Sequence, residues 1–227
     1  MEELIRFDQQ LLLAMNGSDS VWLDQVMLYV TKTATWIPLI VALLVMLLRL
    51  RPWREVLLVV VSVALVVLLC DQFASSLCKP FFQRYRPSHE PALLGSVDLV
   101  NDRRGGLYGF ISSHAANTFG TFMFLMLYLR HAIPRRWLYV LSSSTIFLWA
   151  CLSSYSRIYL GLHYPGDILA GALAGLFFGW LVHRLYLLAA SRYLYQPWTL
   201  PALGLRELTP LLLPITFLLT LVSVSLL

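Results

Sequence analysis

Long apolar runs dominate this sequence and limit what it can fold into. Six of them lie at about residues 36–48, 56–78, 114–129, 137–154, 165–188 and 208–227. A bilayer core of about 30 Å is crossed by roughly 20 apolar residues in a helix. Charged residues make up 13% of the chain, against about 25% in a soluble domain. The sequence therefore predicts an all-α integral membrane bundle of about six transmembrane helices.

The first 30 residues differ from the rest, because apolar side chains are interleaved with charged ones such as Arg6 and Asp8. This composition predicts an N-terminal amphipathic helix that lies in the membrane interface. Asn16-Gly17 is a turn signal, after which we expect a second helix that runs on into the first span. We find no internal repeat or low-complexity tract, so we predict a single membrane domain over residues 1–227.

We attribute the net charge of +5 to arginines near the ends of the membrane spans. Two short loops, 49–54 and 130–136, are rich in arginine. Arginines in short loops mark the cytoplasmic side and face anionic lipid headgroups, so we expect no nucleic acid partner. The opposite side of the bundle is then extracytoplasmic, which in a bacterium means the periplasmic side of the inner membrane. The sequence predicts no particular oligomeric state.

Chargeable side chains gather where the predicted spans meet water. Lys79 follows the second span, and His114 begins the third. Arg157 ends the fourth span, and His163 and Asp167 begin the fifth. Because successive spans alternate in direction, these positions all fall on one side of the membrane. The converging set is Lys79, Arg84, Arg86, Ser112, Ser113, His114, Arg157, His163 and Asp167.

This combination of residues predicts phosphate chemistry. Lysine and arginine side chains recognise tetrahedral oxyanions, and two serines at a helix start add N–H donors and the positive end of the helix dipole. His163 lies four residues before Asp167, so on a helix both share a face. A carboxylate on one imidazole nitrogen leaves the other free to attack phosphorus. His114 comes from a different span and is placed to act as the general acid.

Two other interpretations compete with this one. An i,i+4 His/Asp pair is also a metal-ligand spacing, but neighbouring cations such as Lys79 and Arg86 repel a metal ion, so we expect no metal cofactor. A protein that only binds or transports an anionic lipid needs the cations but not two histidines. Arg84, Arg103 and Arg104 either join the site or meet lipid headgroups.

Two further patterns concern the spans themselves. Asp71 lies eight residues before Lys79, about two helical turns, and either pairs with a polar group beneath the site or marks where the span meets water. In the fifth span Gly171, Gly175 and Gly179 recur every four residues. A stripe of small residues at this spacing predicts close packing against another helix.

At these positions the sequence resembles the type 2 phosphatidic acid phosphatase family of membrane lipid phosphatases. The family pattern Lys-x6-Arg-Pro is met by residues 79–87, and the pattern Ser-Arg-x5-His-x3-Asp by residues 156–167. The middle pattern, Pro-Ser-Gly-His, is met in part, because Ile111 replaces the proline and Ser113 the glycine. A Cβ at position 113 restricts the backbone more than glycine does. The motifs together cover residues 79–167.

The resemblance implies a metal-independent phosphatase with a phosphohistidine intermediate and no cofactor. It implies His163 as the nucleophile, Asp167 as its orienting partner and His114 as the proton donor to the leaving group. The residues that would hold the phosphoryl oxygens are Lys79, Arg86, Ser112, Ser113 and Arg157. The six-span layout is similar to bacterial members that hydrolyse polyprenyl diphosphate carriers, the membrane lipid substrate that we favour. Phosphatidylglycerol phosphate and lipid A phosphates are the alternatives.

Overall fold

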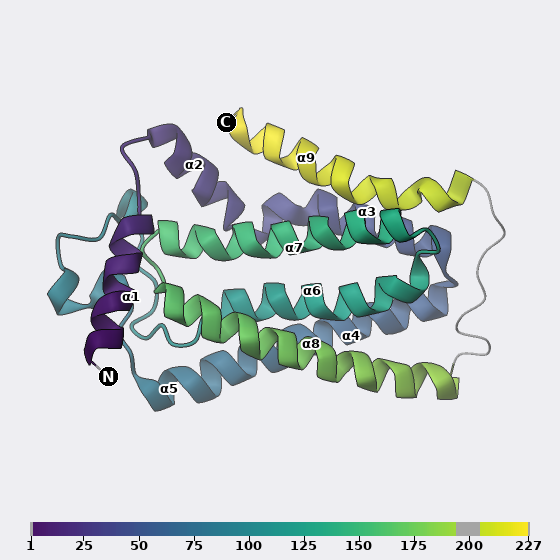
Figure 1. Ribbon diagram of the computed structural model, residues 1–227, viewed down its shortest axis with the longest axis horizontal. Coiled ribbons are helices and arrows are strands. Elements are labelled where there is room, and N and C mark those ends of the chain that lie inside the picture. The colour runs from purple at the N-terminus through teal and green to yellow at the C-terminus, as the bar shows by residue number, and fades with distance from the viewer. Residues whose placement is uncertain (1, 194–204, 227) are drawn as a thin grey trace.

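The computed structural model describes residues 2–193 and 205–226 (Figure 1). A π-helical segment, Gln72–Cys78, joins α4 to α5, and 3-10 turns at Thr33–Trp36 and Leu205–Leu211 precede α3 and α9. The α-helices of the described residues are α1 (Glu2–Met15), α2 (Val21–Val30), α3 (Ile37–Leu50), α4 (Trp53–Asp71), α5 (Lys79–Phe82), α6 (Ser113–Ala132), α7 (Arg136–Tyr159), α8 (Pro165–Tyr193) and α9 (Leu212–Ser225).

Within the described ranges, five helical segments are long and apolar enough to cross a membrane. They are Thr33–Leu50, Trp53–Phe82, Arg136–Tyr159, Pro165–Tyr193 and Glu207–Ser225. The remaining predicted span, residues 114–129, corresponds to α6, which has 20 residues and is less apolar. It packs between α4, α7 and α8 (Figure 1), and a helix surrounded by protein tolerates more polar residues than one that faces lipid. The predicted all-α membrane bundle is confirmed.

The small-residue stripe of α8 packs directly on the backbone of α6, as its spacing predicts. A Cβ added at Gly171, Gly175 or Gly179 would run into a backbone carbonyl oxygen of α6 or its N-cap. The oxygens belong, in the same order, to Ser112, Ala116 and Gly120. Close approach of these two helices fixes Ser112, at the start of α6, beside the start of α8.

Gly175→Ala is expected to destabilise the protein, because the new methyl group overlaps the Ala116 carbonyl oxygen and forces the helices apart. Overpacking of this kind costs about 1–3 kcal/mol. The measurement is thermal unfolding in detergent, with Gly106→Ala as the control, since a Cβ at Gly106 meets nothing within 4 Å. Equal melting temperatures for the two variants would contradict the packing that we describe.

The expected continuity between the second N-terminal helix and the first span is wrong. α2 ends at Val30, and Lys32 is extended, with φ −81° and ψ 128°. Side chains after the break bind the last carbonyls of α2. Thr35 Oγ1 donates to the Tyr29 carbonyl oxygen (2.7 Å), and Trp36 Nε1 donates to that of Val30 (2.8 Å). These bonds stabilise the break, and α2 lies at an angle to α3 (Figure 1).

Helix α1 lies across the end of the bundle at which α7 ends and α8 begins (Figure 1). Leu4 and Phe7 are exposed, whereas Asp8 and Leu12 are buried. The predicted N-terminal helix is therefore present, but one of its charged side chains points into the protein. Its location in a membrane interface stays a prediction.

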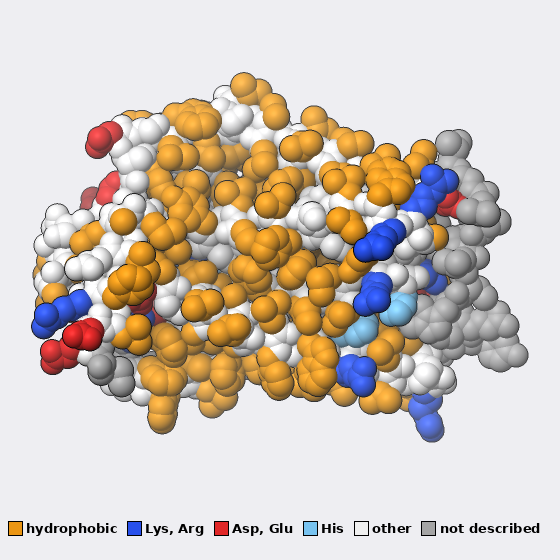
Figure 2. Space-filling model, in the orientation of Figure 1, with side chains coloured by type: hydrophobic (Ala, Val, Ile, Leu, Met, Phe, Trp, Pro, Cys, Tyr) orange, Lys and Arg blue, Asp and Glu red, His pale blue; other side chains and the backbone are white. Residues whose placement is uncertain are grey.

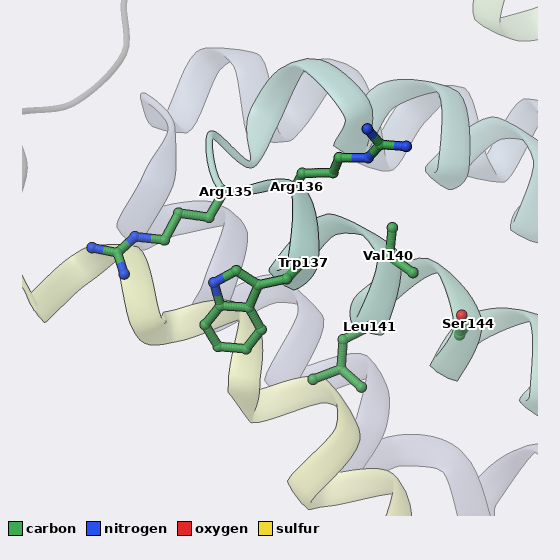
Figure 3. A pocket seen from close by; sticks show the side chains of 6 residues that line it. All are labelled: Arg135, Arg136, Trp137, Val140, Leu141 and Ser144. Carbon is green, nitrogen blue, oxygen red and sulfur yellow. The ribbon is translucent and has the colours of Figure 1, made fainter.

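Side-chain types are distributed as expected for a membrane protein. Apolar side chains cover the middle of the face shown in Figure 2. Arginines gather at the end where α6 ends and α7 begins, and acidic side chains are more frequent at the opposite end. At the arginine-rich end, a surface hollow lies on the first turns of α7, far along the helix from Arg157 (Figure 3). Its lining residues are Arg135, Arg136, Trp137, Val140, Leu141 and Ser144.

Candidate active site

The predicted site residues meet at one end of the bundle. Lys79, at the start of α5, donates from Nζ to Ser113 Oγ on the first turn of α6 (3.3 Å). The same ammonium donates to Ser75 Oγ (3.1 Å), and Ser75 in turn donates to Asp71 Oδ1 (3.3 Å). The two interpretations of Asp71 are thus resolved in favour of pairing, because a chain of hydrogen bonds links it to Lys79 along the π-helical segment.

The start of α6 explains why the chain tolerates Ser113 in place of glycine. Ser113 is the first residue of α6, and its N-cap Ser112 accepts a hydrogen bond at Oγ from the Ala115 N–H (3.3 Å). A helical backbone suits any L-residue, so the Cβ at Ser113 causes no strain. Ile111 packs against Ala74 in a small apolar cluster. The N–H of Ser112 is not an oxyanion donor here, because it donates to the Asp167 carbonyl oxygen (3.0 Å).

The two ring nitrogens of His163 form hydrogen bonds, one with Arg86 and the other with Asp167. Arg86 Nη1 lies 3.1 Å from His163 Nε2, and His163 Nδ1 lies 3.4 Å from Asp167 Oδ2. A guanidinium has donors only, so Nε2 must be the acceptor in this pair. The imidazole proton is then on Nδ1, where it faces the carboxylate. This tautomer leaves a lone pair on Nε2, among the cations of the site.

Asp167 reaches His163 by a route other than the expected shared helix face. His163 lies before α8, which begins at Pro165, so the two residues do not belong to one helix. Asp167 instead occupies the first turn of α8 and accepts at Oδ2 from the backbone N–H of Tyr164 (3.1 Å). This arrangement is half of a capping box, and the same oxygen faces His163.

Backbone hydrogen bonds in the loop before α6 position both arginines of the first motif. Arg86 N donates to the Leu107 carbonyl oxygen (3.0 Å), and Gly109 N donates to that of Arg84 (2.9 Å). This short antiparallel pairing keeps residues 84–86 extended, so Arg84 and Arg86 point the same way. Glycine at 105 leaves room for the buried Arg86, since a Cβ there would lie 2.8 Å from its Nη1.

Burial lowers the pKa of His163 to about 4; the hydrogen bond to Asp167 opposes this shift, whereas the charges of Arg86 and Arg157 add to it. The side chain is 2% exposed. At neutral pH the imidazole is therefore uncharged, the form that a nucleophile needs.

The lowered pKa makes His163 a source of pH-dependent stability. In the unfolded chain its pKa is about 6.5, so below that pH the unfolded state binds more protons than the folded state. The stabilisation is complete above pH 6.5 and is lost as the pH falls towards 4, by up to about 3 kcal/mol. Between pH 7 and 4.5, the melting temperature of the wild type is expected to fall more steeply than that of His163→Asn. Parallel slopes would contradict this assignment.

His114 and Arg157 complete the set. His114, on the first turn of α6, is within electrostatic reach of both Arg157 and His163. Arg157 Nη1 donates to Thr31 Oγ1 after α2 (2.8 Å), whereas its Nε is buried and has no hydrogen-bond partner among the described residues. A buried guanidinium with unused donors is suited to an anionic ligand.

Arg84 joins the site, which is one of its two expected roles, and Asp8 was missed by the sequence analysis. Arg84 does not simply meet headgroups, because it forms ion pairs with Asp167 (2.9 Å) and Asp8 (2.7 Å) and its guanidinium lies over the Tyr164 ring. Asp8 carries no sequence signal for this role, because it lies in α1, outside every motif. In residues 2–193 and 205–226, we find no cluster of three or more His, Cys, Asp or Glu side chains suited to a metal ion.

The geometry defines a class of protein: a helical membrane bundle in which a neutral, carboxylate-oriented histidine lies among cations. Comparison with known proteins agrees with this class. Residues 55–190 match the PAP2 superfamily. Over 184 residues, the chain is 44% identical to a lipid A 4′-phosphatase of Bacteroides thetaiotaomicron, covering 81% of this chain and 78% of that protein. It is 38% identical over 194 residues to a lipid A 4′-phosphatase of Porphyromonas gingivalis, covering 86% and 79%.

Two solved structures share the fold. One is a transmembrane PAP2-type phosphatidylglycerolphosphate phosphatase from Bacillus subtilis, with a TM-score of 0.60, 21% identity and coverage of 82% of this chain and 87% of that one. The other is Aquifex aeolicus LpxE, with a TM-score of 0.53, 23% identity and coverage of 78% and 94%. The chain belongs to the PAP2 superfamily. It is an integral membrane lipid phosphatase.

Proposed function

We propose that this phosphatase hydrolyses the 4′-phosphate ester of lipid A at the periplasmic face of the inner membrane. The substrate is supported by the likeness to two lipid A 4′-phosphatases over about four fifths of every chain compared. These relatives favour lipid A over the polyprenyl diphosphate preferred from the sequence alone. The orientation is supported by the arginine-rich loops at the end of the bundle away from His163.

The observation that carries the chemistry is the pair of contacts at His163, because Arg86 at Nε2 and Asp167 at Nδ1 favour the tautomer with the proton on Nδ1 and the lone pair on Nε2. In the proposed reaction Nε2 attacks phosphorus and the bond to the sugar oxygen breaks. The bound phosphate, an anion, would favour the protonated form of His114, which gives its proton to that oxygen. Water then attacks the phosphohistidine, His114 takes up a proton from it, and inorganic phosphate leaves. Asp167 stabilises the positive charge that develops on the imidazole.

The cations are proposed to neutralise the phosphoryl oxygens throughout. Arg86, which now donates to Nε2 of His163, would turn its donors to the substrate phosphate. Arg157 brings its Nε–H, which has no hydrogen-bond partner in the part of the chain that the structure describes, and Lys79 adds an ammonium that donates to Ser113. The hydroxyl groups of Ser112 and Ser113 supply further donors from the start of α6. Preorganised donors of this kind account for much of the rate enhancement in phosphoryl transfer.

Mass spectrometry of bisphosphorylated lipid A, incubated with the purified protein in detergent and EDTA, tests the proposal. We expect loss of one phosphate, located at the 4′ position by fragmentation, with the 1-phosphate retained. Undecaprenyl diphosphate and phosphatidylglycerol phosphate serve as competing substrates. Faster release from either, or removal of the 1-phosphate, would contradict the substrate assignment. No release from any of them would favour the lipid-binding alternative.

A further inference from the structure

We propose that Asp8, on the N-terminal helix α1, is a positioning residue of this active site. It accepts a hydrogen bond from Nη2 of Arg84 and thereby keeps an oxygen of Asp167 available to His163. The proposal rests on the phosphatase chemistry proposed for His163, and it adds a contribution from a helix outside the motif-bearing segment.

Arg84 divides its guanidinium between two carboxylates. Its Nη1 donates to Asp167 Oδ1 (2.9 Å), and its Nη2 donates to Asp8 Oδ2 (2.7 Å). The other oxygen of Asp8 accepts from the backbone N–H of Gly166, in the first turn of α8 (2.8 Å). The Asp8 side chain is 12% exposed and that of Arg84 is 25% exposed, so these contacts are partly shielded from water. The carboxylate therefore bridges Arg84 and the turn that carries Asp167.

The division matters because a guanidinium and a carboxylate commonly pair through two parallel hydrogen bonds. If Nη2 of Arg84 were free, it could join Nη1 on the Asp167 carboxylate. The contested oxygen is Oδ2, which already accepts from Tyr164 N and faces His163 Nδ1. His163 would then lose the partner that fixes its tautomer. Asp8 prevents this competition by holding Nη2.

Helix α1 has other attachments, so the role of Asp8 can be separated from docking of the helix. Leu12 is fully buried in an apolar cluster that contains Ile158 and Tyr164. The Asn16 side chain donates to the Tyr159 carbonyl oxygen (2.7 Å) and accepts from the Asp98 N–H (2.7 Å). These contacts hold the helix in place when the charge at position 8 is removed.

Asp8→Asn is the direct test, because it keeps the size of the side chain and an oxygen for Gly166 but loses the charge that binds Arg84. We expect kcat to fall by about 10- to 100-fold, as when an orienting partner is lost, while KM and the melting temperature change little. Adding Arg84→Gln removes the guanidinium that would compete with His163 for Asp167, so the kcat of the double variant is expected to exceed that of Asp8→Asn. Glu3→Gln removes an exposed charge from the same helix and is the matched control.

Unchanged kcat in Asp8→Asn, or a double variant no faster than Asp8→Asn, would overturn the proposal. If Asp8→Asn alone does not fold, the effect is measured in the Arg84→Gln background. There, adding Asp8→Asn is expected to leave kcat unchanged, and a further tenfold fall would overturn it. Rates are measured on lipid A and on short-chain phosphatidic acid. Wild-type release from the second substrate alone contradicts only the lipid A assignment, whereas release from neither contradicts both proposals.

Discussion

Replacing His163 with alanine is expected to lower kcat by on the order of 10⁴-fold or more, because the variant lacks the nitrogen that attacks phosphorus. KM is expected to change far less, since Lys79, Arg86 and Arg157 remain to bind the phosphate. The measurement is phosphate release from lipid A in detergent with EDTA. The result should not depend on the chelator if the histidine, rather than a metal ion, activates the reaction.

His183→Gln is the matched control for this loss. His183 is also a buried histidine, but it lies towards the other end of α8 and packs on Phe124 and Tyr186. We expect its replacement to leave kcat within a few-fold of the wild type. A folded His163→Ala variant that retained more than about a tenth of the wild-type rate would contradict the nucleophile assignment.

Arg157→Gln is expected to have the second-largest effect, a fall in kcat of about 10²- to 10³-fold. Arg157 has one hydrogen bond to a side chain, at Thr31, and its buried Nε has no partner among the described residues. It lies within electrostatic reach of Arg86, so the two like charges favour an anion near them. Glutamine keeps hydrogen-bonding groups but supplies no charge to the transition state.

Thr31→Val separates the charge of Arg157 from its anchoring, because it removes the hydroxyl group that accepts from Nη1. We expect Thr31→Val to lower kcat by tenfold at most. Of the two variants, only Arg157→Gln is expected to weaken inhibition by orthovanadate strongly. Equal losses in the two variants would mean that Arg157 acts through α2 rather than on the phosphate.

Much of the fold follows from sequence patterns that depend on local physics. The apolar runs predict the spans, Pro165 marks the start of α8, and the glycine stripe predicts the contact between α8 and α6. Alternation of the spans is enough to bring Lys79, His114 and His163 to one end, where the structure places them. The break before α3 was missed because it depends on the side chains of Thr35 and Trp36, which bind carbonyls of α2.

Within the site, the residue types were predictable but not all of their connections. The i,i+4 spacing of His163 and Asp167 indicated a contact, yet the contact arises in the turn before α8 rather than on a helix face. The ion pair between Arg84 and Asp8 joins residues 76 positions apart. No periodicity links them, because the pairing depends on how α1 crosses the bundle end. Tertiary contacts of this kind appear only once the fold is known.

The central claim is that the phosphoryl group is transferred from the substrate to Nε2 of His163 before water releases it. Single-turnover reactions with lipid A carrying a radiolabelled 4′-phosphate, quenched in alkali to preserve phosphohistidine, test it most directly. The account predicts transient label on the peptide that contains His163, and none on His163→Ala. Phosphate release without any labelled peptide, or label on a different residue, would contradict it.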